Sequence, residues 1–358
     1  MSIALRRLLA QRLIGEPFGN AESAVGWLTA VQAQDYAGAK WGLGQRVADA
    51  TDAALDGAFQ RGKLLRTHVL RPTWHFVLPA DIRWLLALTA PRIQAKNAGI
   101  YRQFELDPRT LRKSEKVLAK ALQADGPLTR AELGSALASA GIGAEGIRLG
   151  YVMMHAELEA VICSGPRRSK QFTYALLDER APSGKVLARD AALARLTKRY
   201  FESHGPATAS DFAWWAGLTL ADARRGLAQV ESALVRQDLA DKTYWSGKRR
   251  PPPKLAGPVL RLLPNYDEFL IAYNDYSPSF DRTLLTRKVG RRDEVLASHL
   301  IVRDGQVIGG WRRTLVKDGV AIEARLLAKL DARAKRDLHA EAARLGRFLD
   351  LPASLRQL

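Results

Sequence analysis

The sequence of 358 residues is poor in cysteine, in acidic residues and in long apolar runs. Its one cysteine, Cys163, can form neither a disulfide within the chain nor a cysteine-based zinc site, which fits a reducing compartment. No stretch approaches the roughly 18 consecutive apolar residues of a membrane span. The N-terminus lacks the order of charged region, apolar block and cleavage site that defines a signal peptide. We therefore expect a cytoplasmic protein.

Basic residues clearly outnumber acidic ones. Lysine and arginine total 55 against 37 for aspartate and glutamate, which gives a formal net charge of +18. Charge of one sign repels itself and destabilises a compact chain, and a polyanion such as nucleic acid is the simplest partner that offsets it. A general solubility charge is the alternative reading. The hydrophobic content of 47% supports packed cores, and the length corresponds to about two to four domains.

Two segments in the middle of the chain follow one plan. DGPLTRAELGSAL begins at Asp125 and HGPATASDFAWWA begins at His204. Each has Gly-Pro, a capping Thr or Ser and an acidic residue that opens an amphipathic helix, and each is followed by a further helix and two strands. That order is typical of a helix-turn-helix with a β-hairpin wing. The sequence therefore predicts an α+β fold of tandem winged-helix domains with a C-terminal mixed α/β region.

The expected boundaries follow from turn residues and periodicity. We predict three winged-helix units and a C-terminal region at 1–107, 108–182, 183–250 and 251–358. In the first unit we expect helices at 3–14, 21–36, 52–61 and 80–97, with a hairpin at 64–78. In the C-terminal region we expect strands at 259–263, 299–303 and 306–316, a tight turn at Asp304-Gly305, and a helix over 320–346.

Four segments, in this order, carry a family resemblance: VQAQDY (31–36), LRTHVLRPTWHFVLPADIRWL (65–85), HAELEAVICSGPRRSKQFTYAL (155–176) and LLPNYDEFLIAY (262–273). Together they resemble the AlkZ/YcaQ-type winged-helix DNA glycosylases over nearly the whole chain. The resemblance implies three tandem winged-helix domains and a β-containing C-terminal region around a concave DNA-binding surface. It also implies excision of alkylated purines, crosslinked ones in some members. Gln32-Ala33-Gln34 is similar to the Gln-x-Gln motif of the AlkZ-like branch, whereas the YcaQ-like branch carries Gln-x-Asp.

The chemistry of this reaction suits a pair of amides. An N7- or N3-alkylated purine is cationic and leaves without a strong general acid, and the oxocarbenium-like sugar must then meet a water on one face. Gln32 and Gln34 each offer donors and an acceptor that can hold and orient that water. We expect these two residues to be catalytic, with no cofactor. The motif has no lysine, so we expect no Schiff base and no lyase step.

The helical prediction over 21–36 conflicts with this role, because residues two apart on a helix point about 200° from each other. Both glutamines can face one site only if the helix ends or distorts there. On such a helix Asp35 would fall on the apolar face formed by Trp27, Leu28 and Val31. We expect it to orient a glutamine or to cap a nearby helix. His75 is either a catalytic or base-contacting residue or a hydrogen-bonded structural one. The six histidines show no metal-binding spacing, so we predict no metal site.

Ten cations are candidates for contacts with DNA. The basic turn PRRSK (166–170) lies between two predicted strands, where a wing tip would track the DNA backbone, although a solvated turn has the same composition. Arg66 and Arg71, near the first predicted hairpin, could equally form structural ion pairs. The candidates are Arg66, Arg71, Arg167, Arg168, Lys170, Lys248, Arg249, Arg250, Arg312 and Arg313.

The sequence thus predicts a monomeric, monofunctional DNA glycosylase that acts on cationic alkylated purines in double-stranded DNA. Two other functions stay open. A non-catalytic transcription regulator would use the same tandem winged helices. A scaffold for other proteins would bind DNA with little dependence on salt.

Overall fold

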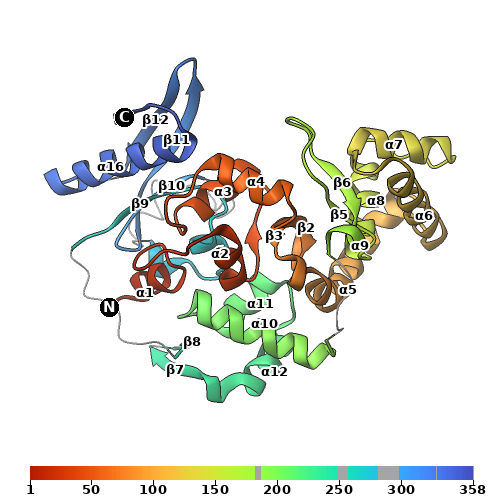
Figure 1. Ribbon diagram of the computed structural model, residues 1–358. Coiled ribbons are helices and arrows are strands. Elements are labelled where there is room, and N and C mark those ends of the chain that lie inside the picture. The colour runs from red at the N-terminus through yellow and green to blue at the C-terminus, as the bar shows by residue number, and fades with distance from the viewer. Residues whose placement is uncertain (182–186, 240, 249–256, 281–297, 328, 358) are drawn as a thin grey trace.

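The computed structural model describes the chain except for residues 182–186, 240, 249–256, 281–297, 328 and 358 (Figure 1). Helices and small antiparallel sheets alternate along the chain, so the α+β class predicted from the sequence is confirmed. Within the described ranges, no helix is both long enough and apolar enough to cross a bilayer.

The N-terminal segment builds a three-stranded sheet with the strand order β1-β3-β2 and surrounds it with helices. Its elements are α1 (Ile3–Ala10), α2 (Ala21–Leu28), β1 (Val31–Gln32), α3 (Tyr36–Gly44), α4 (Asp52–Gln60), β2 (Leu65–Val69), β3 (Arg71–Val77) and α5 (Pro79–Gln103). The predicted hairpin over 64–78 is confirmed as β2 and β3.

The prediction of one helix over 21–36 is wrong. Helix α2 ends at Leu28 because Thr29 has a φ of 73°, which lies outside the helical region. The chain then runs into β1, where Val31 pairs with Phe76 and Gln32 pairs with His75. The glutamines therefore lie in the short segment between α2 and α3 rather than on a helix.

The next segment repeats the order of helices followed by a strand pair. Its elements are α6 (Pro108–Asp125), β4 (Leu128–Thr129), α7 (Arg130–Ser139), α8 (Gly146–Leu158), β5 (Ile162–Ser164), β6 (Thr173–Leu176) and α9 (Leu177–Arg180). The predicted capping box is confirmed: Thr129 and Glu132 each accept a hydrogen bond from the other's backbone N–H at the start of α7.

The third segment has the same plan. It contains α10 (Arg189–His204), α11 (Ala209–Ala216), α12 (Leu220–Val230), a 3-10 turn (Glu231–Ala233), β7 (Leu234–Leu239) and β8 (Lys242–Gly247). Helix α11 opens with a second capping box, formed by Thr208 and Asp211. The two GP-containing segments of the sequence thus begin equivalent helices.

The C-terminal segment forms a five-stranded sheet in the order β13-β12-β11-β10-β9. Its elements are β9 (Leu260–Leu263), α13 (Glu268–Ile271), a 3-10 turn (Ser277–Ser279), β10 (Leu300–Arg303), β11 (Gln306–Val316), β12 (Gly319–Leu326), α16 (Ala332–Leu349) and β13 (Ala353–Gln357). The tight turn at Asp304-Gly305 is confirmed, and both of its residues have positive φ, as a two-residue hairpin turn requires.

The helix predicted over 320–346 is wrong in its first part. Val320, Ile322 and Ala324 are buried in alternation, and β12 pairs with β11 as a strand. The helix α16 starts only at Ala332, where the Asp331 side chain accepts a hydrogen bond from the backbone N–H of Ala334.

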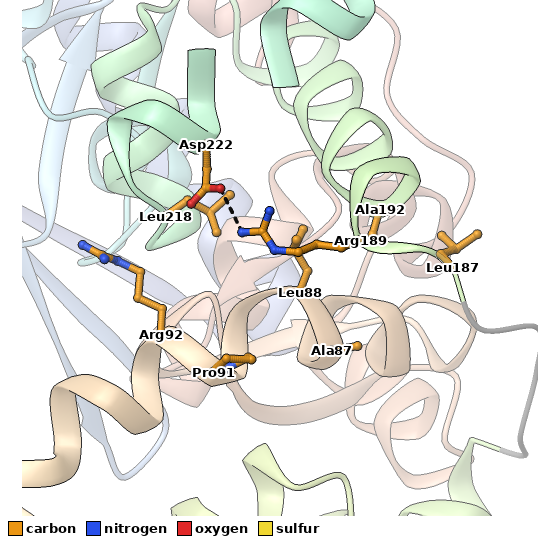
Figure 2. Close-up of a pocket in the computed structure, with 9 residues that line it drawn as sticks. All are labelled: Ala87, Leu88, Pro91, Arg92, Leu187, Arg189, Ala192, Leu218 and Asp222. Atoms are coloured by element: carbon orange, nitrogen blue, oxygen red, sulfur yellow. Dashed lines mark hydrogen bonds and ion pairs between the residues drawn. The ribbon is translucent and has the colours of Figure 1, made fainter. Parts of the chain in front are cut away.

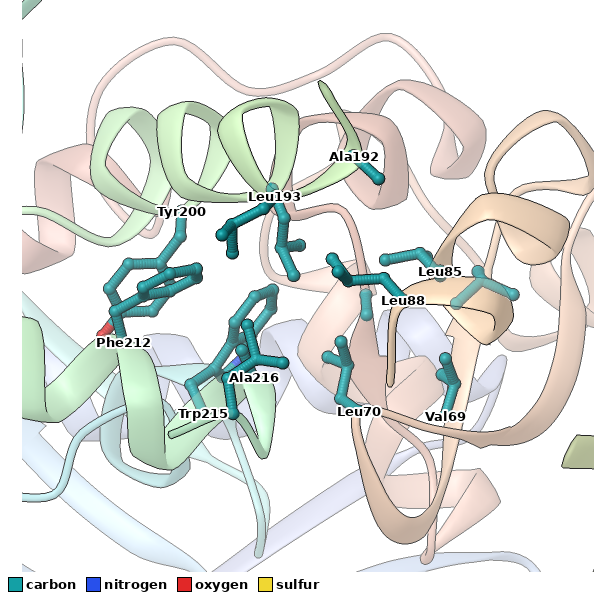
Figure 3. Packing of buried hydrophobic residues seen from close by; sticks show 14 of the residues in the cluster. Val69, Leu70, Leu85, Leu88, Ala192, Leu193, Tyr200, Phe212, Trp215 and Ala216 are labelled. Carbon is teal, nitrogen blue, oxygen red and sulfur yellow. The ribbon is translucent and has the colours of Figure 1, made fainter. Parts of the chain in front are cut away.

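A shared hydrophobic core joins the first and third segments (Figure 3). Leu85 and Leu88 of α5 face Leu193 of α10 and Trp215 of α11 across this core. Interiors packed in this way resist displacement of the elements that line them. The sheet that carries Gln32 is therefore fixed against the third segment rather than supported by its own segment alone.

Candidate active site

Gln32 lies on the edge strand β1 and is almost completely buried, with 6% of its surface exposed. Its backbone N–H points away from β3 and donates a 2.9 Å hydrogen bond to Glu268 Oε1. The pair formed by Gln32 and His75 is thus one of the non-hydrogen-bonded pairs of the ladder, in which opposed side chains lie closest. The Gln32 Oε1 atom is buried and finds no hydrogen-bond partner in the described part of the chain.

His75 is fully buried and its protonation state follows from its contacts. The Nδ1 atom lies 2.8 Å from the Thr73 carbonyl oxygen, which can only accept, so Nδ1 carries the hydrogen and Nε2 keeps its lone pair. Burial and the nearby charge of Arg71 lower the pKa of His75 to about 3. The ring is therefore neutral at physiological pH and can accept a hydrogen bond at Nε2, which has no partner among the described residues.

Gln34 is exposed and follows Ala33, which is fully buried. The Ala33 backbone N–H donates to the Trp74 carbonyl at 2.8 Å, and the Ala33 carbonyl accepts from Arg66 Nε at 2.9 Å. Strand β1 ends at Gln32, and the chain bends at Gln34 and Asp35 before α3 begins. The helical conflict is therefore removed, because the two glutamines lie in a short segment outside both helices, the first buried and the second exposed.

Asp35 caps α3, which is one of the two roles expected for it. Its side chain accepts a 3.0 Å hydrogen bond from the Gly38 backbone N–H. A Cβ atom at Gly38 would lie only 2.7 Å from Asp35 Oδ2 and 2.9 Å from Asn265 Oδ1, so a larger residue would displace at least one of these polar groups. The C-terminal segment thereby reaches the residues next to the glutamines.

Three polar residues near the motif were missed by the sequence analysis: Asn265, Glu268 and His299. The Asn265 backbone N–H donates to His299 Nδ1 at 2.7 Å, and the His299 ring stacks on Trp311 at a centroid distance of 4.7 Å. The Asn265 Oδ1 atom is buried and has no hydrogen-bond partner within the residues that the structure describes. The segment LLPNYDEFLIAY contributed two of these residues to the family resemblance, but no local pattern indicated that it contacts β1 and α3.

Glu268 is a buried carboxylate that holds several elements together. Its Oε1 accepts from Gln32, and its Oε2 accepts from Trp215 Nε1 at 2.8 Å and lies 3.4 Å from His204 Nε2. Burial opposes ionisation of Glu268, but the contact with His204 and the hydrogen bond from Gln32 outweigh it, so its pKa lies below the ordinary value. The charge therefore stays on Glu268 and fixes the Gln32 backbone.

Arg66 and Arg71 are both turned into the protein. Arg66 is 8% exposed, and its Nε donates to the Ala33 carbonyl. Arg71 donates to the Ile271 carbonyl at 3.3 Å, and its Nε and Nη2 atoms are buried. Burial lowers the pKa of both residues. Among the described residues neither arginine forms the ion pair that was the alternative role; both bind backbone carbonyls, and their contact with phosphate stays a prediction.

The cations of the basic turn divide into two groups. Arg167 packs inward, with its Cζ 5.1 Å from the ring centroids of both Tyr36 and Phe172. Arg168 forms a 2.7 Å ion pair with Glu132 and keeps 52% of its side chain exposed, and Lys170 is also exposed. Arg168 and Lys170 are thus the members of this turn that are open to a ligand.

The remaining cations lie on two other parts of the chain. Lys248 is exposed, whereas Arg249 and Arg250 fall outside the described residues. Arg312 is exposed and pairs with Glu323 across the β11–β12 hairpin, and Arg313 beside it is half-buried. In Figure 1 this hairpin and the strands β5 and β6 project toward the same side, with α3 and α4 between them.

Two cavities differ in their relation to the motif. A cavity of about 280 Å³ between α5, α10 and α12 is flanked by the 2.8 Å ion pair of Arg189 with Asp222 and contains none of the predicted site residues (Figure 2). A second one, of about 840 Å³, is lined by Trp74 and His68 of the hairpin and by residues of α7 and α8. The Trp74 backbone carbonyl also accepts from the Ala33 N–H, so one residue that lines this larger cavity also binds the segment with the two glutamines.

The chain is similar to known proteins in both sequence and fold. The family model described as "DNA glycosylase AlkZ-like" matches residues 25–348. The chain is 26% identical over 309 residues to the "Interstrand DNA cross-link repair glycosylase" of Streptomyces sahachiroi, a match that covers 82% of each sequence. It is also similar to the solved structure of the Streptomyces sahachiroi DNA glycosylase AlkZ, with a TM-score of 0.80 and 22% identity over 99% of this chain and 98% of that one.

Proposed function

Because the chain belongs to the AlkZ-like family of DNA glycosylases, we propose that it hydrolyses the N-glycosidic bond of cationic alkylated purines in double-stranded DNA, with Gln32 and Gln34 positioning the water. The observation that carries the proposal is the short non-helical segment between α2 and α3. It presents both amides from one stretch of backbone whose groups are bound by Glu268, Trp74 and Arg66.

The reaction requires the enzyme mainly to orient the attacking water. The leaving purine already carries a positive charge, so its departure needs no strong acid near the motif, and the developing positive charge on the sugar must be met by water. A fixed amide can hold a water at the required angle, and correct orientation alone contributes several kcal/mol to rate. An unmodified purine lacks this charge, so the same site would leave undamaged DNA intact.

Asp35 and His75 support the glutamines in this proposal without reacting themselves. Asp35 fixes the start of α3 directly after Gln34. His75 lies opposite Gln32 as a neutral ring with an available acceptor nitrogen, and its pKa of about 3 is far from the value near 7 that suits a general base at neutral pH.

The DNA-binding surface that we propose includes the projecting parts of the fold. Arg168 and Lys170 between β5 and β6, Arg312 and Arg313 on β11, and Lys248 would neutralise phosphates. Helices α6–α8 with β4–β6, and α10–α12 with β7 and β8, support the prediction of tandem winged-helix units within 1–107, 108–182 and 183–250, followed by 251–358.

We propose that the substrates include bases with large substituents. The Streptomyces sahachiroi relative is named for repair of interstrand crosslinks, and the cavity of about 840 Å³ beside Trp74 leaves room for a substituent larger than a methyl group. We propose that the enzyme works as a monomer in the cytoplasm and needs no cofactor or metal.

The experiment is the release of a base from an N7-methylguanine duplex, followed by alkali to cut the abasic sites. We expect cleavage by the full-length protein on the methylated duplex and none on the unmodified one. The Gln32→Ala variant should release the base at least about 100-fold more slowly, as expected when a positioned reactant is displaced. Binding to DNA without any release by the full-length protein would instead favour the regulator.

A further inference from the structure

Ala33, the residue between the two glutamines, has both its backbone N–H and its carbonyl hydrogen-bonded. The N–H of Ala33 donates to the Trp74 carbonyl at 2.8 Å, which continues the ladder between β1 and β3. The carbonyl of Ala33 accepts from Arg66 Nε at 2.9 Å. The direction of that carbonyl sets the peptide plane that joins Ala33 to Gln34. It therefore sets where the Gln34 side chain points relative to Gln32.

The Arg66 guanidinium is itself held in place by aromatic rings. Its Cζ lies 4.3 Å from the ring centroid of Trp74 and 4.7 Å from that of Phe172. Its backbone N–H donates to Ser164 Oγ at 2.8 Å. A planar guanidinium combines stacking on rings with a directed N–H, which a lysine ammonium cannot do. Arg66 thus has one orientation, and in that orientation Nε faces Ala33.

One of these rings belongs to the basic turn. Phe172 lies two residues after Lys170 and directly before β6. Arg167 of the same turn also contacts the rings, with its Cζ 5.1 Å from the Phe172 and Tyr36 centroids. Tyr36 and Phe172 also contact each other edge to face at 5.0 Å. The turn that exposes Lys170 therefore also packs against Tyr36, two residues after Gln34, and against Arg66, which binds Ala33.

We propose that Arg66 is a positioning residue for the Gln32–Gln34 segment, and that Phe172 of the β5–β6 turn orients Arg66 for this task. This inference rests on the proposed function and adds the residues that set the angle between the two amides. It replaces the role in phosphate binding that the sequence allowed for Arg66. Arg66 acts through the Ala33 carbonyl and touches neither DNA nor the reacting atoms.

The two roles of Arg66 differ in how DNA binding depends on salt. A phosphate contact contributes about 0.9 to the slope of log Kd against log salt, whereas a buried positioning residue contributes nothing. The variants are Arg66→Met, which keeps volume without a donor, and Arg66→Lys, which keeps the charge without the planar fork. Phe172→Leu removes the ring from the second side. Lys170→Gln, at the exposed part of the same turn, is the matched control for a lost surface charge.

For Arg66→Met we expect the single-turnover rate at saturating DNA to fall about 10- to 100-fold, with Kd and its salt slope unchanged. Arg66→Lys should recover little of the rate, and Phe172→Leu should lose less than Arg66→Met. Arg66→Ala should regain part of its rate when guanidinium, but not sodium, is added. An unchanged rate together with a salt slope reduced by about 0.9 would overturn the proposal.

A measurement without turnover separates this inference from the proposed function. Hydrogen exchange of the peptide that spans residues 31–36 should be faster in Arg66→Met than in the unaltered protein, while exchange in α10 should match. If the unaltered protein releases no base but this difference is found, the positioning role holds and the proposed reaction fails. Equal exchange in both proteins would overturn the positioning role, whatever the activity.

Discussion

The Gln32 backbone N–H and the Glu268 carboxylate form a 2.9 Å hydrogen bond across 236 positions of the chain. It ties the edge strand of the N-terminal sheet to α13 of the C-terminal segment. The same carboxylate accepts from Trp215 of the third segment. One buried acidic side chain therefore joins three parts of the chain directly behind the first glutamine.

Replacement of Glu268 by alanine should destabilise the protein strongly. Two buried donors, the Gln32 N–H and Trp215 Nε1, would lose their acceptor, at about 1–3 kcal/mol each. We expect a loss of roughly 2–6 kcal/mol in the free energy of unfolding, measured by urea denaturation. Glu16→Ala removes a side chain that is 90% exposed and should change stability by less than about 0.5 kcal/mol. Similar losses for both variants would refute this role of Glu268.

His75 should make stability depend on pH in one direction. Its folded pKa of about 3 lies below the ordinary value of about 6.5, so the unfolded chain binds a proton that the folded chain does not. The stability is complete above about pH 6.5 and falls as the pH drops from there toward 3, by at most about 1.4 kcal/mol per pH unit for this group. His204, whose pKa burial also lowers, acts in the same direction.

The matched variant for this measurement is His75→Gln, which keeps an acceptor but does not titrate. We expect urea denaturation between pH 7 and pH 5 to show a shallower loss of stability in this variant than in the unaltered protein. Every other titrating group is present in both proteins. Parallel curves would therefore show that His75 does not lower the free energy of unfolding as the pH falls.

The ion pair between Arg46 and Asp267 should be a large contributor to stability. Both N–O distances are 2.8 Å and both side chains are nearly inaccessible. Loss of one partner leaves the other charge buried and unpaired, which costs about 3–5 kcal/mol. We therefore expect Asp267→Ala to lower the free energy of unfolding by about that amount in calorimetry or urea melts. Asp125→Ala, at the exposed C-terminal end of α6, should remain within about 1 kcal/mol.

The exposed cations should steepen the salt dependence of DNA binding, and the buried ones should not. Lys170→Gln should lower the slope of log Kd against log salt by about 0.9 on duplex DNA. Arg168 is paired with Glu132, so Glu132→Gln should free its charge and tighten binding. The control is Lys335→Gln on the exposed face of α16. A slope that falls equally for Lys335→Gln would mean that net charge, rather than the basic turn, determines affinity.

Features that depend on neighbouring residues could be predicted from the sequence. The capping box of Thr129 with Glu132 and the turn at Asp304-Gly305 are both set within four residues, and both are found. The two GP-containing repeats were recognised for the same reason.

Features that depend on distant partners could not. The apolar spacing of Trp27, Leu28 and Val31 suits a helix, but β1 exists because β3 pairs with it more than 40 residues later, and only Thr29 breaks the helix locally. Gln32 and Gln34 were identified through the family resemblance. Their setting, with Glu268 behind one and Arg66 between them, arises from contacts that no local pattern encodes.

The central claim is that two positioned amides, rather than DNA binding alone, produce base release. It is tested most directly by the single-turnover rate on N7-methylguanine DNA and the Kd for the same duplex, measured together for Gln34→Ala and Gln34→Glu. Because Gln34 is exposed, both variants should fold normally. We predict a rate at least about 100-fold lower for Gln34→Ala at unchanged Kd, and a smaller loss for Gln34→Glu, which keeps an acceptor. A Gln34→Ala variant that releases the base at the unaltered rate would contradict the account.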